Sequence, residues 1–200
     1  MSYATLSEFK AAIGITDSTD DAALQSVLDA TDNLIDLYTD RKQGFGTASE
    51  TRYYTAQDWS YTLTDDLVSI TTLQTDDNAD GSYETTWTAG TDFVLAPANA
   101  ALDGQPYTEV DASTAYPRNF PKGVYRGVKI VGVFGFPGGA PNAVKQAALI
   151  QAGAVWSSRT SPFGVIGSQE LGGLLRQTRA LHPEAAILLE PYRRREGLAR

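Results

Sequence analysis

The sequence predicts an α+β fold in which a small helical bundle is interrupted by an antiparallel β-rich block. Apolar residues recur with a helical period near both ends of the chain. The middle is instead rich in Thr, Tyr, Val and Ile, separated by Gly, Pro, Asp and Asn. We expect a helical core at 1–43 and 137–173, a β-rich insertion at 44–136, and a C-terminal helix with an extended basic tail at 174–200.

Two helices are predicted before the β-rich block. Thr5 and Glu8 have the spacing of a capping box, in which each side chain accepts from the other residue's backbone N–H, and Gly14 ends the short helix that follows. A longer amphipathic helix is expected over 20–40, where an apolar stripe repeats every three or four residues. The stripe consists of Leu24, Val27, Leu28, Leu34, Ile35 and Tyr38.

Six strands are predicted between Gly44 and Phe136, because short β-branched and aromatic runs alternate there with turn residues. The runs are 51–55, 67–75, 83–87, 92–96, 107–110 and 128–136. After the breaker FPGGAP, small and apolar residues predict a helix over 142–159. A Gly-rich loop is expected over 160–173, and a last helical turn begins at His182-Pro183.

Composition limits the class of protein. The 200 residues contain no cysteine, which excludes disulfides and thiolate metal sites. No signal peptide is expected, and the apolar runs are too short to cross a bilayer, so we expect a soluble chain made in a cytoplasm. The net charge is −8, but 20 acidic and 4 basic residues lie in 1–112, whereas 4 acidic and 12 basic residues lie in 113–200. Such polarity indicates that the two ends meet different partners.

The stretch TDDNADGSYE at 75–84 resembles the start of a calcium loop. Asp76, Asn78, Asp80 and Glu84 could ligate Ca²⁺, but an EF-hand requires glutamate at its twelfth position, where this chain has Trp87. Asn, Asp and Gly are also the usual residues of a tight turn between strands. We favour the hairpin turn, and a bound calcium ion that braces the hairpin stays open.

No catalytic constellation is predicted. The chain has one histidine, His182, which stands where a helix cap or a surface residue is expected. The doublets Asp20-Asp21 and Asp65-Asp66 have structural explanations at a helix start and a strand start. The glycines near 132–139 do not fit a phosphate-binding loop. We therefore do not expect an enzyme.

The C-terminal arginines are open to three interpretations. Arg193-Arg194-Arg195 could neutralise phosphates, dock into an acidic groove of a protein, or be a solvated terminus. We favour a protein partner over nucleic acid, because the chain as a whole is acidic and has no recognisable DNA-reading helix.

The order of parts resembles the head-to-tail connector (adaptor or head-completion) proteins of long-tailed bacteriophages and gene transfer agents. The resemblance rests on the opening YATLSEF, on DD…AT…ID…YTDR along the long helix, and on TRYY at 51–54. It continues through the Asp-rich hairpin, DFVLAPANA, GQPYTEV and VGVFGFPGGAPNAVKQAALIQA. It is a similarity of pattern over most of the chain.

The resemblance implies a non-enzymatic structural protein of the virion neck, without a cofactor. Family members assemble as a ring, usually twelve-fold, beneath the portal, extend the DNA channel without sequence-specific DNA binding, and dock the stopper or tail-completion protein. Their C-terminal segments commonly bind the portal, a role that would fall here to Arg176, Arg179, Tyr192, Arg193, Arg194, Arg195 and Arg200. The long helix would pack against neighbouring subunits through Leu24, Val27, Leu28, Ile35 and Tyr38.

A second class of protein also fits parts of the sequence. A calcium-braced β-rich module could bind a ligand, for example a carbohydrate, through exposed tyrosines and tryptophans. It would be a monomer that depends on calcium and has no use for residues 174–200.

Overall fold

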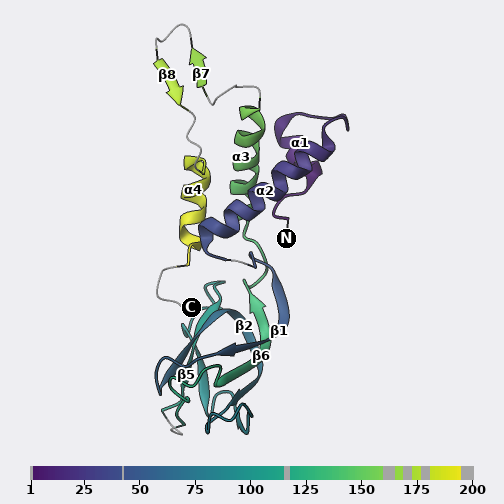
Figure 1. Cartoon of the computed structure of the whole chain (residues 1–200). Helices are drawn as coiled ribbons and strands as arrows, with labels where there is room; N and C mark the ends of the chain where they lie inside the picture. Colours follow the sequence, from purple (N-terminus) through teal and green to yellow (C-terminus); the bar gives the residue numbers. More distant parts are fainter. Residues whose placement is uncertain are drawn as a thin grey trace. The chain divides into compact units, whose positions relative to one another are not determined.

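The computed structural model describes residues 2–41, 43–114, 118–159 and 181–194, and the backbone of 165–168 and 173–176. The chain forms two compact units (Figure 1). The helical unit comprises Met1–Gly44 and Ala140–Arg194, and the sheet unit comprises Phe45–Gly139. The predicted α+β class is confirmed. No helix in the described ranges is long and apolar enough to span a membrane.

The first two helices of the helical unit begin close to where the sequence predicts. Helix α1 (Leu6–Ile13) starts at the capping box, in which Glu8 N donates to Thr5 Oγ1 over 3.2 Å and Thr5 N donates to Glu8 Oε2 over 2.9 Å. Gly14, at φ 74°, ends the helix in the left-handed conformation that glycine tolerates. Helix α2 (Asp21–Thr39) follows.

Helix α3 (Asn142–Ser158) is the centre of the helical unit. It contacts α1, α2 and α4 (Pro183–Leu189), which a short 3₁₀ turn, η2 (Glu190–Tyr192), extends (Figure 1). Small residues on α3 let these helices approach closely. The core of fully buried side chains includes Phe9, Leu24, Leu28 and Ala152.

Two short strands lie between α3 and α4. β7 (Val165–Ser168) and β8 (Gly173–Arg176) pair antiparallel. The prediction of a loop over 160–173 is wrong for 165–168, which form strand β7. The β-branched residues Val165 and Ile166 favour a strand there despite the neighbouring glycines. The remaining residues of the expected loop, apart from Gly173, lie outside the described ranges.

The sheet unit contains all six predicted strands. They are β1 (Thr47–Tyr54), β2 (Tyr61–Thr75), β3 (Thr85–Trp87), β4 (Phe93–Ala96), β5 (Tyr107–Ala112) and β6 (Val128–Gly135). The order is β1-β6-β2-β5-β4 with β3 also on β2, and every pairing is antiparallel. β2 starts at Tyr61 rather than at the expected residue 67, because its first half pairs with β5.

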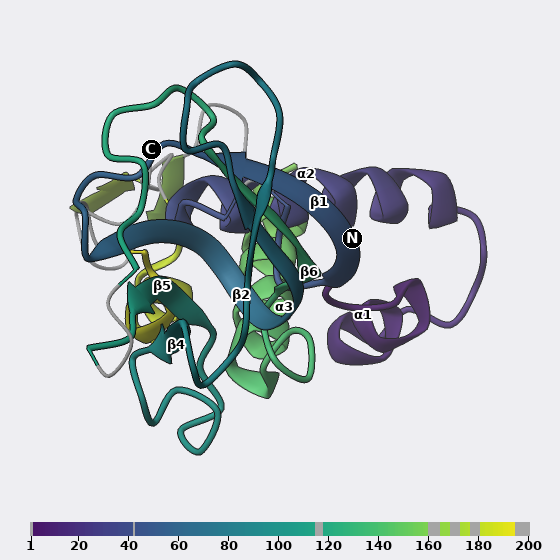
Figure 2. The ribbon, with the colours of Figure 1, turned by 90° about the horizontal axis from the view of Figure 1, so that it is seen from below.

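The core of the sheet unit follows the alternation of its strands. Val128, Ile130 and Phe134 of β6 point inward, and Trp87 stacks on Phe120 with ring centroids 4.4 Å apart. β2 curves, as Figure 2 shows, and its register shifts at several points between Leu63 and Thr72. Among the strands in the described ranges, β1 pairs with β6 alone and is therefore an edge strand.

Candidate interaction surfaces

The Asp-rich loop between β2 and β3 is organised around Asp76, which is 4% exposed. Its Oδ1 accepts from Asp80 N over 3.2 Å and its Oδ2 accepts from Gly81 N over 2.8 Å. Asn78 Nδ2 donates to Asp80 Oδ2 and to Glu84 Oε1, each over 3.2 Å. Gly81 has φ 89°, as the turn interpretation requires.

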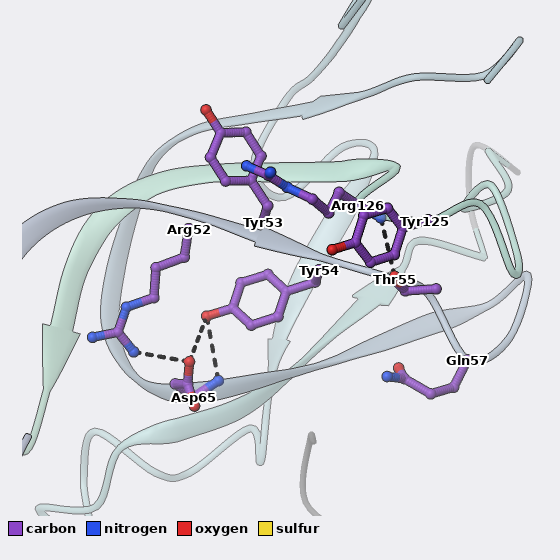
Figure 3. A pocket seen from close by; sticks show the side chains of 8 residues that line it. All are labelled: Arg52, Tyr53, Tyr54, Thr55, Gln57, Asp65, Tyr125 and Arg126. Atoms are coloured by element: carbon purple, nitrogen blue, oxygen red, sulfur yellow. Dashed lines mark hydrogen bonds and ion pairs between the residues drawn. The ribbon is translucent and has the colours of Figure 1, made fainter. Parts of the chain in front are cut away.

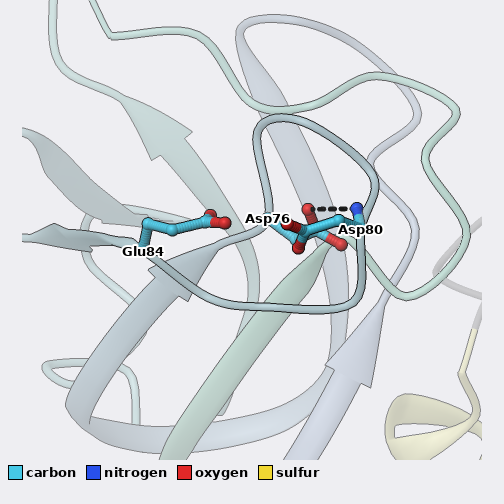
Figure 4. Close-up of side chains that lie close together, drawn as sticks. All are labelled: Asp76, Asp80 and Glu84. Atoms are coloured by element: carbon cyan, nitrogen blue, oxygen red, sulfur yellow. Dashed lines mark hydrogen bonds between the residues drawn. The ribbon is translucent and has the colours of Figure 1, made fainter.

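Asp76, Asp80 and Glu84 gather closely enough to hold a metal ion, with carboxylate oxygens within 4.8 Å of one another (Figure 4). Both oxygens of Asp76 nevertheless already accept backbone N–H groups, so this carboxylate closes the loop without a cation. Hydrogen bonds from Ser82 N hold the pKa of Asp80 below its usual value. The geometry favours a hairpin tip, and calcium binding stays a prediction.

The residues at 190–194 are attached to the end of α2. Arg194 N donates to Thr39 O over 3.0 Å, and Arg41 Nε donates to Tyr192 O over 3.1 Å. Arg41 is 7% exposed; burial, aided by the nearby charge of Arg194, lowers its pKa to about 10. We call Thr39, Arg41 and the segment 190–194 the C-terminal anchor. The sequence analysis missed Arg41, because nothing local in the sequence indicates that this arginine is buried.

Three of the residues predicted to bind the portal lie in this anchor: Tyr192, Arg193 and Arg194. The Arg193 side chain is 54% exposed and approaches Glu190 at 3.9 Å, an exposed pair of little energetic weight. Arg176 lies at the end of β8, where only the backbone is described. Arg179, Arg195 and Arg200 lie outside the described residues.

The stripe predicted to pack against a neighbouring subunit serves this chain's own helical unit. Leu24, Leu28 and Ile35 are fully buried, and Val27 packs on the same core as Leu24. The Tyr38 hydroxyl donates to Glu190 Oε2 over 3.0 Å in the C-terminal anchor. Leu24, Leu28 and Ile35 therefore offer no surface to another subunit, because they are buried inside this chain, whereas a subunit contact through the half-buried Val27 and Tyr38 stays a prediction.

The apolar surface of α2 lies elsewhere. Leu37 is 82% exposed and Leu34, three residues earlier on the same side of the helix, is 37% exposed. The sequence analysis placed Leu34 on the buried stripe and overlooked Leu37. The signal was present, because Leu37 follows Ile35 by only two residues and so lies off the helix face of Leu24, Leu28 and Ile35.

The N-terminal segment is held by two carboxyl groups of α2. Tyr3 N donates to Asp32 Oδ1 over 3.4 Å, and the Tyr3 hydroxyl donates to Asp36 Oδ1. Burial raises the pKa of Asp32 to about 6, against the opposing effect of the Tyr3 N–H, and burial also raises the pKa of Asp36. Two of the acidic residues of α2 therefore have a structural role, because they hold Tyr3 by hydrogen bonds.

The acidic doublets examined for catalysis have structural partners. Asp21 pairs with Lys10 over 2.5 Å, and Asp65 pairs with Arg52 over 2.9 Å. His182 is the N-cap residue of α4, and its backbone N donates to Gln151 Oε1 over 2.7 Å. Asp21, Asp65 and His182 therefore each make contacts that stabilise the fold.

A cavity of about 520 Å³ lies at the edge of the sheet unit (Figure 3). Its lining is polar and aromatic: Arg52, Tyr53, Tyr54, Thr55, Gln57, Asp65, Tyr125 and Arg126. Arg52 lies between Glu50 (2.8 Å) and Asp65 (2.9 Å), and the Tyr54 hydroxyl donates to Asp65 Oδ2 over 3.2 Å. Burial, with the charge of Asp65, raises the pKa of Tyr54. The sequence does not predict this site, because Asp65, Tyr125 and Arg126 join the segment 52–57 only in the folded chain.

Comparison with protein families matches residues 3–72 to the phage gp6-like head-tail connector proteins. The matched region covers α1, α2 and the strands up to most of β2. The resemblance to the connector proteins is confirmed. Comparison with curated proteins finds no match.

Solved structures share the fold of this chain over nearly its whole length. A chain in the neck of an empty gene transfer agent particle, computed with C6 symmetry, is 18% identical with a TM-score of 0.56, covering 99% of this chain and 94% of that one. A chain in the neck of the native particle, computed with C12 symmetry, is 22% identical with a TM-score of 0.54 over 98% and 92% of the two chains. A chain of the native virion is 20% identical with a TM-score of 0.52 over the same shares. The similarity of fold therefore includes the sheet unit as well as the helices.

Proposed function

We propose that this chain is a structural protein of the virion neck, a head-to-tail adaptor that lies beneath the portal and extends the DNA channel. It would offer the docking surface for the stopper or tail-completion protein. One observation carries the proposal: the fold matches a chain of a gene transfer agent neck over 99% of this chain and 94% of that chain. The connector family match over 3–72 supports the same role. The role is architectural rather than enzymatic.

The adaptor would act as a homo-oligomeric ring, most simply twelve-fold. The matched neck structures were computed with C6 and C12 symmetry, which supports a ring for this chain by analogy of fold. The exposed residues Leu34 and Leu37 of α2 supply apolar surface that subunit contacts could cover.

The C-terminal arginines would bind acidic surface of the portal. The set is Arg176, Arg179, Arg193, Arg194, Arg195 and Arg200, with Tyr192 beside them. The C-terminal anchor supports this role, because it fixes the backbone of 192–194 against the end of α2, directly before Arg195 in the sequence. Guanidinium groups suit such pairing, since they bind carboxylates in a bidentate manner.

Double-stranded DNA would pass the ring without sequence-specific binding. The net charge of −8 supports this, because an acidic wall does not adhere to phosphate. A ring whose channel wall proved strongly basic would contradict this part of the proposal.

The proposal is tested by the mass of the purified protein in solution, alone and mixed with the portal protein of the same particle, with and without a calcium chelator. We expect a ring, or a complex that forms only with portal, and in both cases no effect of chelation. A monomer that ignores portal and unfolds on chelation would instead establish the calcium-braced module.

A charge reversal tests the portal contact separately. Replacing Arg193 and Arg195 by glutamate is expected to weaken portal binding at least tenfold while leaving the thermal unfolding unchanged. Lys122→Glu in the sheet unit is the matched control, because Lys122 is also exposed and pairs only at the surface with Asp58. Equal portal binding by both variants would contradict the proposal that the C-terminal arginines bind the portal.

A further inference from the structure

Strand β1 is an open edge of the sheet unit. It pairs with β6 over all eight of its residues without a register shift, and it pairs with no other described strand. Along an antiparallel edge strand, alternate backbone N–H and C=O groups point away from the sheet. β1 contains no proline, lysine or bulge; of the features that protect an edge from pairing it has only the charged side chains of Glu50 and Arg52, which pair with each other.

The 520 Å³ cavity lies at the C-terminal end of this strand, where Arg52, Tyr53 and Tyr54 line it. Its lining includes Arg52 and Tyr54 together with Tyr53, which project from opposite faces of the strand (Figure 3). A single cavity meets side chains of both faces only at the edge or the end of a strand. The cavity therefore lies beside the last three residues of β1, next to the line that an added strand would follow.

Two cations flank the edge on one face. The Arg126 guanidinium lies 4.2 Å from the ring centre of Tyr53, and Lys129 Nζ lies 5.4 Å from the ring centre of Tyr83. The two tyrosine rings are themselves 5.8 Å apart. Within the described residues neither cation forms an ion pair, whereas Arg52, Arg118 and Lys122 of the same unit each have a carboxylate partner.

Arg126 is held in place by its backbone. It has φ 56°, a left-handed conformation that residues other than glycine rarely adopt. Thr55 Oγ1 accepts from Arg126 N over 3.0 Å, and the Tyr83 hydroxyl donates to Arg126 O over 2.9 Å. These bonds fix the backbone of Arg126, and its guanidinium lies over the Tyr53 ring beside the edge. Tyr125, 83% exposed, adds an uncovered ring next to it.

We propose that the edge of β1 binds an extended, acidic segment of a partner protein by strand addition. Backbone hydrogen bonds to β1 would supply affinity, and carboxylates of the segment would pair with Arg126 and Lys129. The chain's own C-terminal tail has the wrong charge for this site. Nucleic acid is disfavoured, because a phosphate backbone cannot continue the sheet; the carboxylates of Glu50 and Asp65 near this edge are both paired with Arg52. The inference concerns the sheet unit alone and needs neither the ring nor the portal.

The test uses the full-length protein and three fluorescent probes. They are an eight-residue peptide of alternating Asp and Val, its counterpart of alternating Lys and Val, and a single-stranded DNA oligonucleotide. Fluorescence anisotropy is expected to show binding of the acidic peptide only. Hydrogen exchange is expected to show slower exchange of the β1 amides when that peptide is bound.

Variants assign the binding to this edge. Arg126→Gln with Lys129→Gln is expected to weaken binding of the acidic peptide at least tenfold, and Lys122→Gln, a matched loss of charge in the same unit, is expected to leave it unchanged. Tighter binding of the oligonucleotide, or binding of the acidic peptide without protection of β1, would overturn the proposal. Failure of the acidic peptide to bind would do the same.

Discussion

Asp32 shows at the scale of one residue how burial sets a pH dependence. Its pKa is raised from 3.8 to about 6, chiefly by burial, so the folded protein holds this proton more tightly than the unfolded chain. Stability is therefore lost as the pH rises from about 4 to about 6, and the loss persists above pH 6. The raised pKa corresponds to roughly 3 kcal/mol at neutral pH.

Asp32→Asn is expected to stabilise the protein at pH 7.5 by about 1–3 kcal/mol, because the amide oxygen can still accept from Tyr3 N without a buried charge. The advantage over wild type should shrink as the pH falls toward 5. Urea unfolding at several pH values measures it, and Asp29→Asn removes a charge from the exposed side of the same helix as a control. An equal advantage of Asp32→Asn at every pH would contradict the assignment.

The pairing of β2 with β6 depends, at the scale of an element, on a single glycine. A Cβ added to Gly132 would lie 2.3 Å from Ser69 O, a backbone atom of β2 that cannot rotate away. The glycine therefore marks a close approach of two strand backbones rather than a turn.

Gly132→Ala is expected to destabilise the sheet unit by about 2 kcal/mol or more, since the two strands must separate. Near-ultraviolet circular dichroism, which reports the Trp87–Phe120 stack, follows the thermal unfolding of this unit. Gly153→Ala in α3 is the matched control: its Cβ meets nothing within 4 Å, and alanine stabilises a helix by up to about 1 kcal/mol. Equal unfolding temperatures of the two variants would show that β2 and β6 adjust without cost.

At the scale of the whole molecule, the C-terminal segment has two parts with different roles. Helix α4 buries Ala185 and Leu189 in the helical unit, and the C-terminal anchor follows it. The last six residues come after the anchor. Removal of the last 25 residues, which would test portal docking if the tail were independent, would also remove a helix from the core.

Two truncations separate these roles. A chain that ends at Arg194 is expected to unfold at the wild-type temperature, because the anchor is complete. A chain that ends at Leu181 is expected to lose several degrees, because α3 loses the side chains of α4 and Gln151 loses the N–H of His182. Differential scanning calorimetry compares them, and equal stability of both chains would contradict a structural role for α4.

The sequence by itself determined the α+β class, the four longer helices and all six strands of the sheet unit. The signals for these elements are local: a capping box at Thr5 and Glu8, a helical period over 20–40, and β-branched runs between turn residues. It also favoured a hairpin at Asp76, because the turn chemistry of Asn, Asp and Gly is encoded in neighbouring residues.

Only the tertiary structure decided which surfaces are free. The stripe of Leu24, Leu28 and Ile35 could pack within this chain or against another chain, because an amphipathic pattern does not specify which surface covers it. In the structure these side chains are buried within the chain. The contact of Arg41 with Tyr192 joins residues that are 151 positions apart in the sequence. The contact of Arg126 with Thr55, beside the open edge, joins residues that are 71 positions apart. Such contacts leave no local pattern, because they arise when distant segments pack together.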